Sequence, residues 1–280
     1  MFEPLQYEFF LRGLLAATLV GGLCGLIGTY IVLRKMAYIG HGLSHAIFGG
    51  AVVSYVLSIN FFIGASAWGF LSALIITFMT RRKEIAADAA IGIVTTASFA
   101  MGLAIISRYK TFTRSFDAAL FGNILGVSGQ DLIAIIIVSA VSITTIILGY
   151  KLLLFTTFDR EVAQLYGVPT GWIDAGFSLI LAATIVVSLQ VLGVTLIASA
   201  IVIPPIVARL LTNSFMKMLF LSSVIGSLCG LCGIYLSFYI DVSSGATIVL
   251  LSTALFAIVL GYTSIRNKGR IRNISKFSDL

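Results

Sequence analysis

The sequence predicts an all-α protein: a polytopic transmembrane helical bundle of about eight to nine spans. Three observations support this fold class. Hydrophobic residues make up 59% of the chain. Charged residues make up only 10%, whereas soluble domains carry about 25%. The basic residues gather in short clusters between long apolar runs, which is typical of topology determinants. We therefore attribute the net charge of +7 to basic residues that orient the chain in the membrane, and we expect no nucleic-acid partner. Scarce polar linkers predict a single domain over residues 1–280.

Apolar runs of membrane-spanning length are expected at about nine places. The first is too long for the core of a signal peptide, so it is expected to be an uncleaved span. A further apolar segment, 118–126, is too short to span. It is interpreted as a re-entrant or interfacial helix, unless the span count is wrong by one. The nine runs cover 9–33, 38–60, 61–80, 87–107, 132–156, 172–189, 191–211, 215–240 and 245–263.

The basic clusters predict the orientation in the cell's inner (plasma) membrane. Most of them fall on one side if the N-terminus is outside, which places the C-terminus in the cytoplasm. One group, at positions 108, 110 and 114, falls on the outer side and breaks the rule. The clusters that agree are Arg34-Lys35, Arg81-Arg82-Lys83, Lys151 with Arg160, Arg209 with Lys217, and Arg266 through Lys276.

His41 and His45 are the only two histidines of the chain, and they lie four residues apart in one apolar run. That spacing places both imidazoles on the same helix face. Imidazole is a common ligand of transition metals, and polar groups at membrane depth are costly without a function or a partner. The pair is therefore a candidate metal site. The alternative is two buried histidines that hydrogen-bond to neighbouring carbonyl groups.

Four residues near or within apolar runs are candidates for gating. Gly40 and Gly42 flank His41 and are expected to loosen the helix there and free backbone carbonyls. Pro204 and Pro205 interrupt another run, because a proline removes a helix donor and kinks the helix. That kink is equally interpretable as structural or as a hinge.

Catalysis inside the membrane is a weak alternative. His41 and His45 have the spacing of a zinc-protease motif, but Gly42 occupies the position of its glutamate, so no general base is present. Ser44 and His45 are adjacent and point apart on a helix. The sequence contains no P-loop, so ATP would have to act through another subunit. The chain is thus predicted not to be an enzyme.

Two glycine-rich segments resemble each other. They are 21–30 and 226–235, in runs predicted to cross the membrane in opposite directions. Small residues that permit close helix packing explain the likeness better than an internal repeat does. The second segment contains Cys229 and Cys232, and packing is also the preferred interpretation of these two cysteines.

A charged amphipathic stretch, 158–169, is expected to form a short helix outside the membrane. Asp159 is suited to cap its N-terminus and Gly167 to end it. Together with Arg160, Glu161 and Ala163, these residues are candidates for docking a cytoplasmic partner. The alternative is an ordinary loop helix.

The segment from Arg34 to Ala46 resembles the Arg-x-Met-Ala-x-x-Gly-Asp-x-x-Ser-His-Ala pattern of a known family. This family comprises the membrane permeases of ATP-binding-cassette (ABC) importers for manganese, zinc and iron. The resemblance extends over nearly the whole chain. Further matching segments are 88–93, 120–126, 191–196 continuing to Pro204, 208–211 and 245–249.

The resemblance implies a type II ABC importer-like permease that works as a homodimer. A dimer of cytoplasmic ATP-binding subunits would drive it, and an extracytoplasmic metal-binding protein would deliver the ion. The family's metal-path aspartate and histidine correspond to His41 and His45. Because nitrogen replaces oxygen at His41, the preference is expected to move from manganese towards zinc. Near the outer gate, the family's proline is replaced by serine after Asp241, which adds Asp241 to the gating candidates.

The expected function is the permease subunit that moves a divalent transition-metal ion inward along the dimer axis. The expected ion is zinc or manganese, with iron as a third candidate, and no cofactor is expected. Each protomer would contribute His41 and His45, giving up to four imidazoles. A stand-alone secondary transporter or channel is the first alternative, and an intramembrane metalloenzyme is the weaker one.

Overall fold

The computed structural model describes residues 3–81, 85–109 and 122–278, and within these ranges the chain is helical without strands. This confirms the predicted all-α class. Two short 3-10 turns, η1 (Glu3–Gln6) and η2 (Ile124–Gly126), accompany the helices. The helices are α1 (Glu8–Leu33), α2 (Tyr38–Val56), α3 (Phe61–Thr80), α4 (Ala87–Tyr109), α6 (Gly129–Leu148), α7 (Tyr150–Phe158), α8 (Arg160–Leu165), α9 (Thr170–Leu192), α10 (Ile197–Leu211), α11 (Phe215–Ile240) and α12 (Ser244–Ser278).

Seven helices of the described chain are long and apolar enough to cross a membrane: α1, α3, α4, α6, α9, α11 and α12. The other two predicted spans correspond to α2 and α10, which fall outside this group. With 15 residues, α10 is about 22 Å long, shorter than the hydrocarbon core of about 30 Å. The chain is therefore a multi-pass membrane protein in which α2 and α10 pack among longer or more apolar spans.

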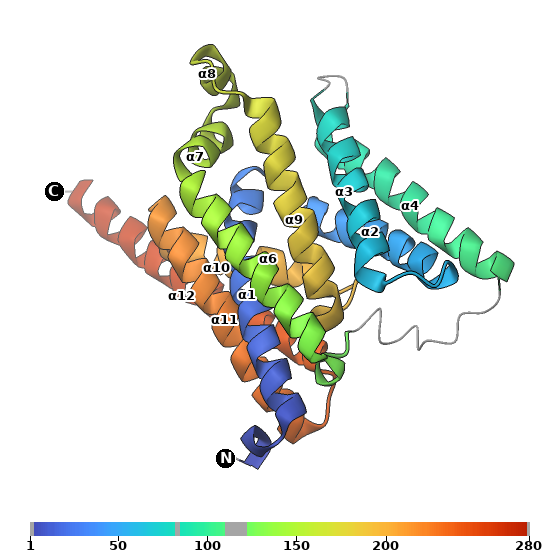
Figure 1. Ribbon diagram of the computed structural model, residues 1–280. Helices are drawn as coiled ribbons and strands as arrows, with labels where there is room; N and C mark the ends of the chain where they lie inside the picture. Colours follow the sequence, from blue (N-terminus) through green and yellow to red (C-terminus); the bar gives the residue numbers. More distant parts are fainter. Residues whose placement is uncertain (1–2, 82–84, 110–121, 279–280) are drawn as a thin grey trace.

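The helices form two groups joined by α9 (Figure 1). In one group, α1 packs against α6, α10 and α11, and α12 packs on α10 and α11. In the other, α2 packs against both α3 and α4. The connection between them is made by α9, which packs on α1, α3 and α6. Helix α2 also contacts α10.

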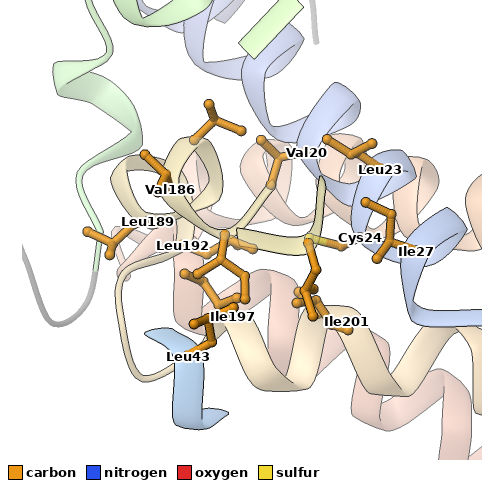
Figure 2. Close-up of a cluster of buried hydrophobic side chains, with 14 of the residues drawn as sticks. Val20, Leu23, Cys24, Ile27, Leu43, Val186, Leu189, Leu192, Ile197 and Ile201 are labelled. Carbon is orange, nitrogen blue, oxygen red and sulfur yellow. The ribbon is translucent and has the colours of Figure 1, made fainter. Parts of the chain in front are cut away.

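A buried apolar cluster fixes this junction (Figure 2). Leu43 of α2 is fully buried in it, next to Ile197 of α10. Burial of such side chains matters here chiefly through dense packing, because lipid tails are as apolar as the core. Since Leu43 lies between the two histidines in the sequence, this packing fixes the turn of α2 that carries them. The labelled members are Val20, Leu23, Cys24, Ile27, Leu43, Val186, Leu189, Leu192, Ile197 and Ile201.

The two similar glycine-rich segments pack against each other in α1 and α11. Gly21 faces Gly226, Gly25 faces Ser222, and Gly230 faces Ala17, so the contacts run antiparallel. This confirms the predicted opposite directions and the packing interpretation. Cys229 is likewise buried among apolar neighbours of α10, α11 and α12, whereas Cys232 is exposed, so the packing interpretation holds for Cys229 alone.

Two predicted spans have different boundaries in the structure. The run 132–156 is divided, because the backbone departs from helical geometry at Gly149, between α6 and α7. The run 191–211 is also divided: α9 continues to Leu192, and Gly193 then turns the chain with φ +76°. Glycine adopts this conformation without steric cost, so α10 begins only at Ile197.

The predicted short segment 118–126 is described only from Gly122 onward. Ile124 of η2 is buried, and the Asn123 amide donates to the Gln190 carbonyl at the end of α9. This part is too short to span, as expected, while a re-entrant helix stays a prediction. Residues 82–83, 110, 114 and 118–121, which figured in the sequence predictions, lie outside the described residues.

Candidate metal site

The two imidazoles lie side by side on α2. The ring centroids of His41 and His45 are 4.6 Å apart, with an interplanar angle of 71°. His41 is exposed in the single chain and His45 is half-buried. On its other side, the His45 ring meets the Phe99 ring of α4 edge-on at 5.2 Å. The structure therefore brings together the predicted ligand pair on a face of α2 that the rest of the described chain leaves partly open.

Helix α2 is held firmly beneath this pair. The Ser44 hydroxyl lies 2.8 Å from the His41 carbonyl oxygen and 3.0 Å from the Val194 carbonyl oxygen, and can donate to either. Val194 belongs to the non-helical connection between α9 and α10, whose carbonyls need partners from outside a helix. Ser44 thus ties α2 to that connection. Its hydroxyl faces these two backbone carbonyl oxygens, which accords with the prediction that Ser44 and His45 do not form a nucleophile–base pair.

Neither Gly40 nor Gly42 breaks the helix, and Gly42 provides close packing. The prediction that they loosen α2 is wrong in this structure, because α2 is continuous from Tyr38 to Val56. A side chain at Gly42 would overlap Ile91 of α4. A β-carbon at Gly40 would lie 3.4 Å from the Ile201 side chain of α10. Their proposed role in gating stays a prediction.

The prolines lie inside a continuous helix as well. Helix α10 runs through Pro204 and Pro205. Pro205 has no N–H to offer the Ile201 carbonyl four residues earlier. Gly28 of α1 packs so closely on this carbonyl oxygen that an added side chain would overlap it. This contact gives the proline pair a packing role, and a hinge stays a prediction.

Asp241 lies in the turn between α11 and α12. It is exposed and adopts the left-handed conformation, with φ 56°. Its amide donates to the Ser237 carbonyl and caps α11. Its assignment to a gate also remains a prediction.

The predicted helix outside the bundle is present as α8. The Asp159 side chain accepts a hydrogen bond from the Val162 amide and caps the helix. Gly167 ends the stretch with φ +75°. Helix α8 projects at one end of the molecule, next to the start of α9 (Figure 1). Both local predictions are confirmed, and the docking role itself stays a prediction.

The side chains that α8 presents differ in part from the predicted set. Ala163 is fully buried, so its side chain is covered by the chain itself and does not form part of the outer surface. Leu165 and Tyr166 are 85% and 78% exposed. The sequence did not single out these two, because the side of so short a helix that faces outward is set by the fold.

Among the described residues, no group of three or more His, Cys, Asp or Glu side chains is placed to hold a metal ion. One chain thus offers two imidazoles and leaves the remaining coordination positions open.

Comparison with known proteins identifies the family. Residues 6–263 match the ABC 3 transport family. The chain belongs to this family. The manganese transport system membrane protein MntC of Halalkalibacterium halodurans is 38% identical over 261 residues, covering 93% of this chain and 89% of MntC. A probable iron transport system membrane protein of Haemophilus influenzae is 37% identical over 266 residues, covering 95% and 98%. The structure of PsaBC from Streptococcus pneumoniae in complex with Fab aligns with a TM-score of 0.82 at 34% identity, covering 92% and 93%.

Membership of the ABC 3 transport family confirms the resemblance seen in the sequence. The chain is a membrane subunit of a transporter and not an enzyme, and ATP hydrolysis resides in a separate subunit. The family also argues against a stand-alone transporter and against an intramembrane metalloenzyme.

Proposed function

We propose that this ABC 3 family member is the permease of an importer for divalent transition-metal ions, and that His41 and His45 bind the ion in transit. The observation that carries the proposal is the pair of imidazole rings 4.6 Å apart on a partly open face of α2. Imidazole nitrogen is a preferred ligand of first-row transition metals. Polar side chains kept at membrane depth are expected to serve a pathway.

A second copy of the chain would complete the site. A divalent ion such as zinc takes about four ligands, and one chain supplies two imidazoles from its described residues. The exposure of His41 in the single chain suits a position on the dimer axis. Two protomers would then offer up to four imidazoles. Partial coordination within that set would allow the ion to leave again.

The ligand chemistry favours zinc over manganese. The resemblance implies an aspartate at the position of His41, and replacing a carboxylate by an imidazole moves a site away from manganese. The relatives are named for manganese and iron transport. The expected cargo is zinc or manganese, with iron as a third candidate, and the preference is shifted towards zinc relative to a site that contains the carboxylate.

The charge distribution supports the proposed orientation. Arg34, at the end of α1, and Arg160, at the start of α8, both pair with Asp174 near the start of α9, and Arg81, after α3, contacts the Gly171 carbonyl in the first turn of the same helix. Glu8 marks the opposite end of α1. The positive-inside rule then places the N-terminus outside and the C-terminus in the cytoplasm. In that orientation α8 faces an ATPase dimer in the cytoplasm, and the opposite end receives the ion from an extracytoplasmic metal-binding protein.

The test is metal uptake by the permease and its ATPase reconstituted together in vesicles. We expect ATP-dependent uptake of zinc or manganese that is lost when His41 and His45 are both changed to alanine. The matched control is Tyr38→Phe, at an exposed position one turn before His41 on α2. Full uptake by the double alanine variant would refute the assignment of His41 and His45 as metal ligands. Uptake by the permease without ATPase or ATP would favour the stand-alone transporter instead.

A further inference from the structure

A buried ionic cluster joins three segments at the end of the bundle that carries α8. Its centre is Asp174, in the second turn of α9. One carboxylate oxygen, Oδ1, accepts a hydrogen bond from Arg34 Nη1 at 2.9 Å, and the other, Oδ2, forms an ion pair with Arg160 Nη2 at 3.1 Å. One carboxylate thus holds two guanidinium groups that are far apart in the sequence.

Arg34 is fully engaged in this cluster. Its Nε donates to Thr157 Oγ1 and its Nη2 to Thr156 Oγ1, each at 3.1 Å. The guanidinium carbon lies 4.6 Å from the centroid of the Phe177 ring, within the range of a cation–π contact. The Arg34 and Asp174 side chains are only 11% and 13% exposed. Burial lowers the pKa of Arg34, and the Asp174 carboxylate opposes that effect.

The two arginines belong to the two segments that matter for transport, α8 and the connection that leads into α2. Arg160 is the first residue of α8, the proposed docking helix. Arg34 caps α1 and begins the short connection to α2, whose first residue is Tyr38. Asp174 therefore links the docking helix directly to the segment that leads into the helix with His41 and His45.

The cluster is not locked in by dense packing. A cavity of about 210 Å³ lies beside Arg34, Arg160 and Asp174. Hydroxyl groups of Thr77, Thr80 and Ser178 line it, together with those of Thr156 and Thr157. A cavity of this size, lined by both polar and apolar side chains, admits several water molecules. The arginine side chains therefore have room and alternative partners if α8 moves relative to α9.

We propose that Asp174 is a positioning residue that transmits movement of α8 to α2 through its ion pairs with Arg160 and Arg34. A buried carboxylate loses much more when one partner leaves than an exposed one does. When Arg160 leaves Asp174, the carboxylate depends on Arg34 alone for its charge partner. The attraction between Asp174 and Arg34 thus becomes stronger, and this shifts the α1–α2 connection. The inference rests on the proposed function, in which α8 docks the ATPase and α2 carries the metal ligands.

The test uses the complete transporter in vesicles and measures ATP hydrolysis and metal uptake in the same preparation. For Asp174→Asn we expect ATP hydrolysis to continue while uptake per ATP falls on the order of tenfold, within the range of known coupling energies. Asp174→Glu keeps the charge and should restore part of the uptake. The matched control is Glu8→Gln, which removes the exposed ion pair between Glu8 and Arg12 at the opposite end. It should leave uptake per ATP unchanged.

Two outcomes would overturn the inference. The first is an Asp174→Asn transporter with normal uptake per ATP. The second is a proportional loss of hydrolysis and uptake that Asp174→Glu does not relieve, which indicates a purely structural role. If Asp174→Asn fails to fold, Arg160→Gln replaces it, because Arg160 is 40% exposed; normal coupling in that variant also refutes the proposal. Absence of metal uptake by the wild-type transporter would instead refute the proposed function.

Discussion

Gly21 of α1 and Gly226 of α11 face each other so closely that a side chain on either would overlap the backbone carbonyl of the other. The contact lies within the interface of two antiparallel spans, and Gly25 and Gly230 extend it in both directions. In a membrane, close backbone approach of this kind provides the packing that hydrophobic burial cannot. The two similar segments of the sequence are thus the two sides of one interface.

The first prediction concerns this interface. Gly21→Ala and Gly226→Ala should each destabilise the fold by about 1–3 kcal/mol, as overpacking does elsewhere, because backbone rather than a flexible side chain must move. Thermal unfolding in detergent measures the effect. Gly261→Ala is the control, since an added β-carbon there meets nothing within 4 Å. An unchanged unfolding temperature for both interface variants would contradict the packing assignment.

The course of the spans was largely predictable, because their apolar runs and basic flanks report on the bilayer directly. The internal breaks were not. Gly149 and Gly193 lie inside the runs 132–156 and 191–211, where hydropathy cannot distinguish a turn from a continuous helix. A tertiary contact stabilises the non-helical connection after Gly193, because the carbonyl of Val194 in this connection faces the Ser44 hydroxyl of α2. Such a contact depends on residues about 150 positions apart.

The second prediction concerns metal preference. His41→Asp should retain transport and raise the ratio of manganese to zinc uptake by about tenfold, equivalent to about 1.4 kcal/mol of differential affinity. The reason is that a carboxylate oxygen suits manganese better than an imidazole nitrogen does. Competition between the two ions in vesicles measures the ratio. His41→Gln controls for loss of the imidazole alone, and an unaltered ratio in His41→Asp would show that residue 41 does not touch the ion.

The third prediction concerns Ser44. Ser44→Ala should destabilise the protein by about 1 kcal/mol, the net value of one hydrogen bond, because the buried Val194 carbonyl loses its donor. We also expect weaker transport, since Ser44 positions the turn of α2 between the histidines. Unfolding and uptake are measured together. The control is Thr253→Ala, whose hydroxyl bonds only within its own helix; equal effects of the two substitutions would argue against a positioning role.

The histidine pair was predictable because two titratable groups in an apolar run have few structural explanations. The surface of α8 was less so. A helix of six residues gives too little periodicity to decide which side faces the bundle, so Ala163 was placed on the outside. Its full burial results from packing against the rest of the chain, and only the fold reveals Leu165 and Tyr166 as the outer pair.

The fourth prediction separates these two surfaces of α8. Leu165→Asp and Tyr166→Asp should weaken binding of the ATPase by at least about thirtyfold, the loss of about 2 kcal/mol expected when a central interface side chain is removed. The permease itself should keep its stability, because both side chains are largely exposed. Ala163→Trp should instead unfold α8 locally, since no space exists at a fully buried alanine.

Glu161→Arg tests the charged side of the helix and should uncouple ATP hydrolysis from uptake. Co-purification of the ATPase, thermal unfolding of the permease alone and uptake in vesicles distinguish these effects. If the ATPase binds all the exposed-position variants normally and stays coupled, α8 is not the docking element.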